Sequence, residues 1–127
     1  MKDFKKYYII NATPDLVFLA LTNPTIIKLW SGDDAIMSAE PNTEFSLWRG
    51  NICGLNLEFI ENKKIVQEWF FGEQVEKSIV TILLHEHQKG TSVELRHNNI
   101  PDADYDDIIE GWNSEYFGAI QEFYEEG

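Results

Sequence analysis

The residue best placed for chemistry is His97, which follows an alternating run of apolar and polar residues. Val93, Leu95 and His97 are two apart, and every second side chain of a strand points to the same face, so we expect all three to face the interior. A neutral imidazole that is buried there needs a hydrogen-bond partner. His97 is therefore either a satisfied core histidine, bonded to a strand or a Tyr hydroxyl, or a polar anchor for a ligand held inside the protein.

Large apolar side chains could form the wall of a ligand site around that histidine. Aromatic rings supply much of the lining of small-molecule sites, and a few polar groups fix the orientation of the ligand. The candidate ligand-binding residues are Trp30, Phe45, Trp69, Phe71, His97, Trp112 and Tyr116. The alternative is that these rings fill the interior at normal core density and leave no cavity.

Other nucleophiles and metal ligands are weaker candidates. Cys53 is the only cysteine; no base is placed beside it by sequence, and its position before Gly54 is typical of a small buried residue. His85 and His87 would share one face of a strand, but no third ligand follows at metal-site spacing. No phosphate-binding glycine loop or nucleophile elbow is present in the sequence. We therefore predict no catalytic residue, no metal and no cofactor.

A long C-terminal helix over residues 104–126 is expected to carry part of the aromatic wall. Its bulky apolar residues recur at steps of three and four, which is the period of one helix face. They are Tyr105, Ile109, Trp112, Tyr116, Ile120 and Phe123. Asp104 is the expected N-cap. Gly111 and Gly118 each cost about 1 kcal/mol relative to Ala in a helix interior, and they fall outside this stripe, so the sequence leaves their role open.

The rest of the chain predicts one strand, two short helices and an antiparallel meander. Thr13-Pro14 and Asn23-Pro24 are helix-start signals for helices that run to about Leu21 and Trp30. Alternating or β-branched stretches predict strands. These strands span residues 3–11, 44–48, 51–60, 65–71, 78–86 and 91–98. Short turns between them make successive strands antiparallel neighbours. We expect the inner face of the sheet to carry Leu55, Leu57, Val80, Ile82, Leu84, Val93 and Leu95.

Composition and charge narrow the function classes. The 127 residues suit one domain over 1–127, and 43% hydrophobic and 13% aromatic residues are typical of a globular protein. The net charge is −12, and residues 102–127 contain nine acids and no Lys or Arg. This charge repels phosphate backbones and anionic lipids, so we expect neither a nucleic acid nor a membrane partner. A single cysteine and no signal-type apolar run predict a cytoplasmic protein.

Several short motifs follow one another in register along nearly the whole chain. They are Thr13-Pro14, Leu21-Thr22-Asn23-Pro24, Gly50-Asn51-Ile52-Cys53-Gly54, Lys64-Ile65-Val66-Gln67-Glu68-Trp69, Ser78-Ile79-Val80-Thr81-Ile82, Gly90-Thr91 with His97, and Gly111-Trp112 with Tyr116-Phe117 and Ile120. In this order and spacing they resemble the homologues of the activator of the ninety-kilodalton heat-shock protein ATPase. The similarity is to the C-terminal-type domain of that family, within the START-like helix-grip (SRPBCC) superfamily.

This resemblance implies an α+β helix-grip fold, in which a curved antiparallel sheet wraps around the C-terminal helix and two short helices close one end. It does not imply one activity, and the function that we predict is a non-enzymatic binding domain. The domain would be co-chaperone-like, with a chaperone partner in the stress response, or would hold a small hydrophobic ligand between sheet and helix. A cyclase- or hydrolase-like enzyme acting on a hydrophobic molecule in the same cavity is the alternative, because fold alone does not fix function. Co-chaperones of this family also use a separate N-terminal domain, which we do not expect in 127 residues.

Overall fold

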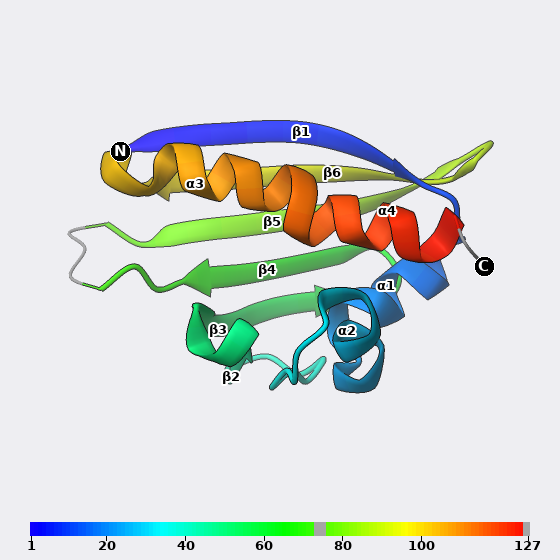
Figure 1. The fold of residues 1–127 in the computed structure, drawn as a ribbon, viewed down its shortest axis with the longest axis horizontal. Helices are drawn as coiled ribbons and strands as arrows, with labels where there is room; N and C mark the ends of the chain where they lie inside the picture. The colour runs from blue at the N-terminus through cyan, green and yellow to red at the C-terminus, as the bar shows by residue number, and fades with distance from the viewer. Residues whose placement is uncertain (73–75, 126–127) are drawn as a thin grey trace.

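The computed structural model describes residues 1–72 and 76–125, and there it shows a six-stranded sheet and a long C-terminal helix (Figure 1). The strands are β1 (Lys2–Ile10), β2 (Thr43–Leu47), β3 (Ile52–Ile60), β4 (Lys64–Trp69), β5 (Ser78–His87) and β6 (Gly90–Ile100). The helical elements are α1 (Pro14–Thr22), α2 (Pro24–Ser31), two 3₁₀ turns (Trp48–Gly50 and Asp102–Asp104), α3 (Tyr105–Glu110), a π-helical segment (Gly111–Tyr116) and α4 (Phe117–Glu125). The predicted helix end at Glu126 lies outside the described residues.

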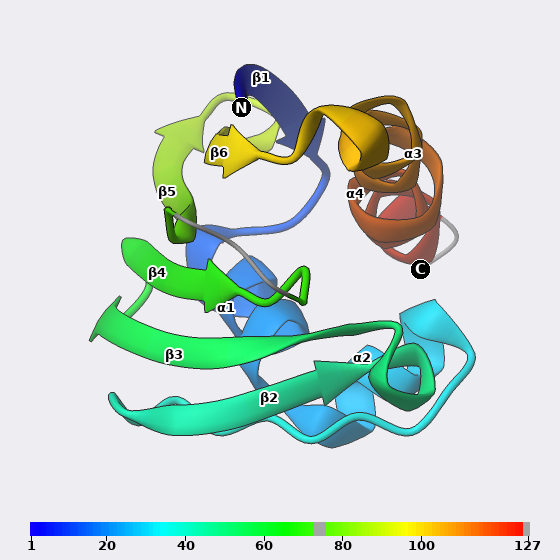
Figure 2. The ribbon, with the colours of Figure 1, turned by 90° about the vertical axis from the view of Figure 1, so that its left-hand side faces the viewer.

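The strands form one antiparallel sheet in the order β1-β6-β5-β4-β3-β2. Each strand from β2 to β6 pairs with its neighbour in sequence, and β1 pairs with β6, where Tyr8 lies opposite Val93. The sheet is curved, and the C-terminal helix lies along its concave side (Figure 2). The predicted α+β helix-grip architecture is confirmed. No helix within the described part of the chain is long and apolar enough to cross a membrane.

The helix pair at one end of the sheet is defined by proline and asparagine. Pro14 and Pro24 lie in the first turns of α1 and α2. Backbone N–H groups there have no partner within the helix, so the N–H that proline lacks costs no hydrogen bond. Between them, Asn23 ends α1 and caps α2: its side chain accepts from the backbone N–H groups of Thr25 at 2.9 Å and Ile26 at 3.2 Å. Gly32, at φ 83, ends α2. The chain then turns toward the C-terminal helix.

The inner face of the sheet matches the expectation on β5 and β6 but not on β3. Val80, Ile82, Leu84, Val93 and Leu95 are all buried, as predicted. The prediction was wrong for Leu55 and Leu57, which are half-buried on the other face, because the buried residues of β3 are Gly54 and Asn56. Asn56 tolerates burial because its Oδ1 accepts from Gln67 at 2.9 Å and its amide donates to neighbouring oxygens.

The C-terminal helix contains a wide turn that the three-four spacing did not predict. In the π-helical segment the backbone N–H of Phe117 donates to the carbonyl of Trp112, five residues earlier. The two rings consequently stack, with centroids 5.6 Å apart. Trp112, Tyr116 and Ile120 are buried as expected, and Phe117 is fully buried as well. The other predicted stripe residues are only half-buried: Tyr105, Ile109 and Phe123.

The π turn also accounts for one of the two helix glycines. A Cβ on Gly118 would lie 2.3 Å from the carbonyl oxygen of Asn113, five residues earlier, so only glycine fits this backbone. Close contact with the helix backbone therefore explains Gly118, whose role the sequence left open. A Cβ on Gly111 would meet nothing within 4 Å, and the reason for that glycine is different: it borders an open space.

Candidate functional site

A cleft of about 490 Å³ opens between the C-terminal helix and the turn that joins β2 to β3. This volume lies within the usual range for small-molecule sites. The helix side is lined by Asp107, Ile108, Gly111, Trp112, Glu115 and Tyr116, and the opposite side by Asp33, Trp48, Arg49, Asn51, Ile52 and Trp69. The described residues therefore include an open, mostly apolar site at one end of the groove between sheet and helix.

The β2–β3 turn forms its wall of the cleft with an unusual backbone. Trp48 at φ 48 and Arg49 at φ 57 are both left-handed, and Gly50 follows at φ 88. Among the described residues, the other non-glycine positions with positive φ are all asparagines, which tolerate this region: Asn42, Asn62 and Asn99. Left-handed bulky residues cost on the order of 1–3 kcal/mol each and concentrate at functional sites.

The facing wall carries the second uncommon backbone feature of the molecule. Gly111, Trp112, Glu115 and Tyr116 belong to the π-helical segment and line the cleft. Single π turns inside α-helices are rare and occur frequently at functional sites. Two costly backbone conformations, which come from parts of the chain far apart in sequence, thus meet at one cleft.

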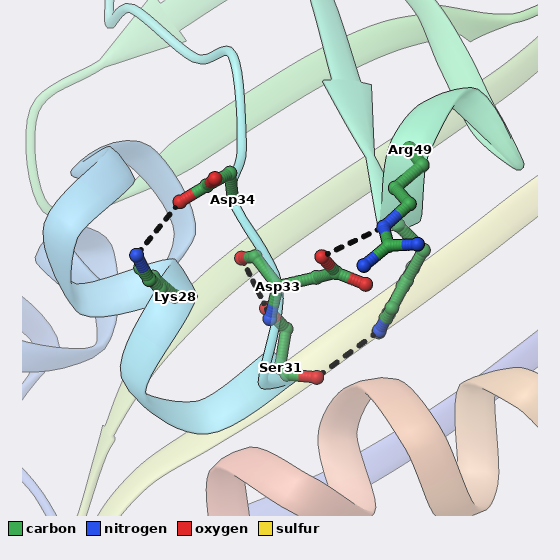
Figure 3. Close-up of polar contacts among 6 residues, drawn as sticks. Lys28, Ser31, Asp33, Asp34 and Arg49 are labelled. Atoms are coloured by element: carbon green, nitrogen blue, oxygen red, sulfur yellow. Dashed lines mark hydrogen bonds and ion pairs between the residues drawn. The ribbon is translucent and has the colours of Figure 1, made fainter.

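The β2–β3 turn is tied to the segment that follows α2. The indole Nε1 of Trp48 donates to the backbone carbonyl of Ser31 at 3.2 Å. The Nε atom of Arg49 lies 3.4 Å from Oδ1 of Asp33, and Figure 3 shows this pair reaching across from the turn to the chain after α2. Beside it, a hydrogen bond from Lys28 lowers the pKa of Asp34. The contacts of Trp48 and Arg49 link the turn to the chain after α2 at the mouth of the cleft.

The aromatic side chains at and behind the cleft form a continuous row of ring contacts, in which only the Trp69–Trp112 pair is stacked. The rings of Trp69 and Trp112 lie 4.7 Å apart at an interplanar angle of 26°. Tyr116 follows at 4.6 Å from Trp112, and Trp30 at 5.1 Å from Tyr116. Trp48 closes the row at 6.0 Å from Trp30. Because each ring is held by the next, the apolar wall is preorganised for contact with a flat molecule.

The indole N–H groups of the cleft tryptophans are all engaged within the protein. Trp69 donates to Oε1 of Gln67 at 3.0 Å, and Trp112 donates to Nδ1 of His97 at 3.0 Å. Trp48 donates to a backbone carbonyl, as described above. These three side chains therefore offer the cleft their ring carbons and leave no indole donor for a ligand.

His97 lies behind this wall as a fully hydrogen-bonded core residue. Its Nδ1 accepts from Trp112, so Nε2 carries the proton and donates to Oγ of Ser78 at 2.8 Å. The Ser78 hydroxyl in turn donates to the carbonyl of Asn98 at 3.2 Å. Burial lowers the pKa of His97 to about 3, so the ring is neutral at physiological pH. His97 orients Trp112 and does not itself line the cleft.

The seven candidate residues from the sequence divide into three groups. Trp69, Trp112 and Tyr116 line the cleft. Trp30 and His97 contact those three from behind. Phe45 packs 6.5 Å from Trp69, and Phe71 lies 6.1 Å from His97, but neither ring borders the cleft.

Sequence reasoning missed the whole β2–β3 turn and the carboxylates of the cleft. Trp48 and Asn51 were assigned to strand ends and Arg49 to the gap between them, although Trp-Arg-Gly-Asn is an ordinary composition for a tight turn. Asp107 and Glu115 were counted with the other acids of the helix. Glu115 lies three residues after Trp112, so the two share a helix face, but the sequence does not show that this face borders an opening.

Tyr116 brings the one hydroxyl of the aromatic wall. Its side chain is only 3% exposed, burial raises its pKa, and its hydroxyl has no hydrogen-bond partner among the described residues. Every fully buried side-chain nitrogen or oxygen in the described part of the chain does have a partner, so this hydroxyl must reach accessible space. The cleft is the accessible space that Tyr116 lines.

The remaining candidate groups lie elsewhere. Nε2 of His85 is 3.1 Å from a carboxylate oxygen of Glu94, whose second oxygen accepts from Arg96 at 2.7 Å. Cys53 is half-buried in β3. Within residues 1–72 and 76–125, no three His, Cys, Asp or Glu side chains gather as metal ligands.

Comparison with known proteins places this chain in one family. The family model described as "Activator of Hsp90 ATPase homolog 1-like protein" matches residues 11–125. The chain belongs to this family. The human protein "Activator of 90 kDa heat shock protein ATPase homolog 1" is 24% identical over 114 residues, which are 88% of this chain and 34% of that protein. This chain spans only 20% to 35% of the length of the curated relatives that match it.

Solved structures extend the match to nearly the whole chain. An HSP90 activator from Plasmodium falciparum superposes with a TM-score of 0.86 at 25% identity, over 95% of this chain and 94% of that one. The Aha1 dimer from Colwellia psychrerythraea gives a TM-score of 0.82 at 16% identity, over 98% and 97% of the two chains. The family resemblance seen in the sequence motifs is thus confirmed.

Proposed function

We propose that this domain binds a flat, largely apolar small molecule in the cleft between the C-terminal helix and the β2–β3 turn. The observation that supports it most strongly is the meeting of two costly backbone conformations at one aromatic-walled opening of about 490 Å³. A core that only needed filling would gain nothing from a left-handed Trp48 and Arg49.

Binding without catalysis fits this site better than the cyclase- or hydrolase-like alternative. General acid–base chemistry needs a group with a suitable pKa within reach of the substrate. His97 is the inward titratable residue beside the cleft wall, but both of its nitrogens are engaged and burial lowers its pKa to about 3. In our proposal it acts only by holding the indole of Trp112 in place.

The test is a titration of the tryptophan fluorescence with a panel of flat apolar compounds. Three of the four tryptophans line the cleft, so binding should change the emission in a saturable way. The blocking variant is Gly111→Leu: a Cβ there meets nothing within 4 Å, so the side chain can enter the cleft without unfolding the helix. Ser114→Leu adds the same side chain to an exposed position of the same segment that does not line the cleft.

We expect Gly111→Leu to weaken binding at least tenfold and Ser114→Leu to bind like the wild type. Both variants should unfold at or above the wild-type midpoint, because leucine is a better helix former than glycine or serine. Absence of a saturable change with every compound, or equal binding by the Gly111→Leu variant, would contradict the proposal.

We propose as a second function a co-chaperone-like contact with the ninety-kilodalton heat-shock chaperone in the cytoplasm. Family membership supports it, together with the similarity over 95% of this chain to a protein titled an HSP90 activator. The domain should change the ATPase rate of the chaperone from its own organism through surface contacts, so Gly111→Leu should act like the wild type. An unchanged rate, with no complex at high micromolar concentration, would discard this function.

A further inference from the structure

We infer that the molecule bound in this cleft is an organic cation, a flat ring system bearing an ammonium or guanidinium group, an inference that rests on the proposed ligand-binding function of the same cleft. The ring would lie against the aromatic wall, and the cationic group would meet the carboxylates of the C-terminal helix.

The charges that line the cleft are unbalanced. Asp33, Asp107 and Glu115 face one base, Arg49. Arg49 is already paired with Asp33 at 3.4 Å. Asp107 and Glu115 have no hydrogen-bond or ion-pair partner among the described residues. The opening therefore presents two uncompensated negative charges, in a molecule whose net charge is −12, and its field attracts cations.

The wall suits a cation as well as an apolar ring. The faces of indole and phenol rings attract cations through their negative quadrupole. An anionic ligand would need donors, but the indole N–H groups of Trp48, Trp69 and Trp112 are all spent on protein acceptors. The side chain of Arg49 is 86% exposed and its guanidinium is paired with Asp33, so it makes a poor anion anchor.

Tyr116 gives an independent sign that a polar ligand atom belongs in the cleft. The hydroxyl of this 3%-exposed residue reaches the cleft and has no partner among the described residues, so it is available to a ligand atom there. A phenol hydroxyl can donate or accept. A polar substituent or the charged group of the ligand would satisfy it.

The experiment compares three probes that share one ring system, by titration calorimetry at pH 7 and low salt. They are 2-naphthylmethylammonium, 2-naphthylmethanol and 2-naphthoate, which are positive, neutral and negative. We expect the ammonium compound to bind at least about fivefold more tightly than the alcohol, the order of one exposed ion pair. The carboxylate should bind most weakly, and added salt should shrink the difference.

Two double variants, each of which removes two negative charges, show which carboxylates cause the preference for the ammonium compound. Asp107→Asn with Glu115→Gln should bring the ammonium compound and the alcohol to within about twofold of each other. Asp106→Asn with Glu122→Gln removes two exposed acids of the same helix that do not line the cleft, and it should keep the wild-type preference.

Equal binding of the ammonium compound and the alcohol, or tightest binding of the carboxylate, would overturn the inferred positive charge and leave the proposed cleft standing. A preference that falls equally in both double variants would overturn the assignment to Asp107 and Glu115. Binding of none of the three probes would count against the cleft itself.

Discussion

At the scale of residues, the centre of the molecule is a pair of stacked indoles with a polar side chain behind each. Trp69 is held by Gln67 and Trp112 by His97, so the two rings that face the cleft are fixed by buried hydrogen bonds. Such bonds are costly to break because the freed partner stays buried. The inward position of His97 could be predicted from strand alternation. Its partner on the helix could not, because Trp112 is brought there by tertiary contacts alone.

The first prediction concerns the acid sensitivity that His97 imposes. Burial lowers its pKa from 6.5 to about 3 in the folded protein. Between those values the unfolded chain binds a proton that the folded chain does not, so stability falls as the pH falls below about 6.5. The slope approaches about 1.4 kcal/mol per pH unit. His97→Gln should unfold more easily at pH 7 but should lose about 2 kcal/mol less than the wild type between pH 7 and pH 5.

Urea denaturation at several pH values measures this slope. The control is His87→Gln, at a partly exposed histidine on the far end of β5, which should keep the wild-type slope. If the wild type and His97→Gln show the same pH dependence, the folded protein must tolerate a protonated His97.

At the scale of elements, the π turn in the middle of the C-terminal helix shifts the register of its side chains, and this shift determines which of them pack against the sheet. A regular α-helix would place Phe117 beside the stripe of Trp112 and Tyr116, whereas the π turn buries all three. The sequence predicts the existence and length of this helix well, because its apolar period extends over six residues of one face. It does not predict the shift, since Gly118 alone marks it and an isolated helix glycine has several explanations.

A pair of glycine variants tests the π turn. Gly118→Ala should destabilise the protein by about 1–3 kcal/mol, because the new methyl group would lie 2.3 Å from the Asn113 carbonyl oxygen. Gly111→Ala should instead stabilise it by up to about 1 kcal/mol through helix propensity. Thermal and urea unfolding of both variants measure the difference. If alanine were tolerated equally at the two positions, the helix would have to be regular.

The β2–β3 turn gives a second prediction at this scale. Arg49→Gly should raise the unfolding free energy by about 1 kcal/mol, because glycine adopts φ 57 without strain. The loss of an exposed ion pair with Asp33 offsets little of this gain. Asn62→Gly changes another left-handed residue, at φ 63, and should have almost no effect since asparagine already tolerates it. If Asn62→Gly raised the unfolding free energy more than Arg49→Gly did, the turn would not be strained.

Strand faces show where sequence reasoning about elements fails. On β5 and β6, alternation identified the buried side correctly, although Ile79 and Leu83 add apolar residues to the other face of β5. On β3 both faces have credible core residues: Leu55 and Leu57 on one, Gly54 and Asn56 on the other. The face with Gly54 and Asn56 is the buried one. There the side chain of Gln67 on β4 satisfies Asn56, and such a cross-strand pair cannot be recognised in the sequence of either strand alone.

At the scale of the whole molecule, the fold can be predicted from the order of its elements, whereas the cleft depends on contacts between distant segments. The order of one strand, two helices, a meander and a long helix was enough to predict the helix-grip architecture, because few folds cover such a sheet with one helix. The cleft depends on where segments distant in sequence meet: the chain after α2, the β2–β3 turn, and the middle of the C-terminal helix. Family membership supports the proposed chaperone contact on the surface, but it does not decide between that function and ligand binding in the cleft.

The most direct test of the cleft as the functional site is a nuclear magnetic resonance titration that follows the four indole N–H signals. With 2-naphthylmethylammonium as the probe, the signals of Trp48, Trp69 and Trp112 should shift together and saturate in the wild type and in Ser114→Leu. They should stay in place in Gly111→Leu. Shifts that persist in Gly111→Leu, or four signals that do not move in the wild type, would contradict a binding site between the C-terminal helix and the β2–β3 turn.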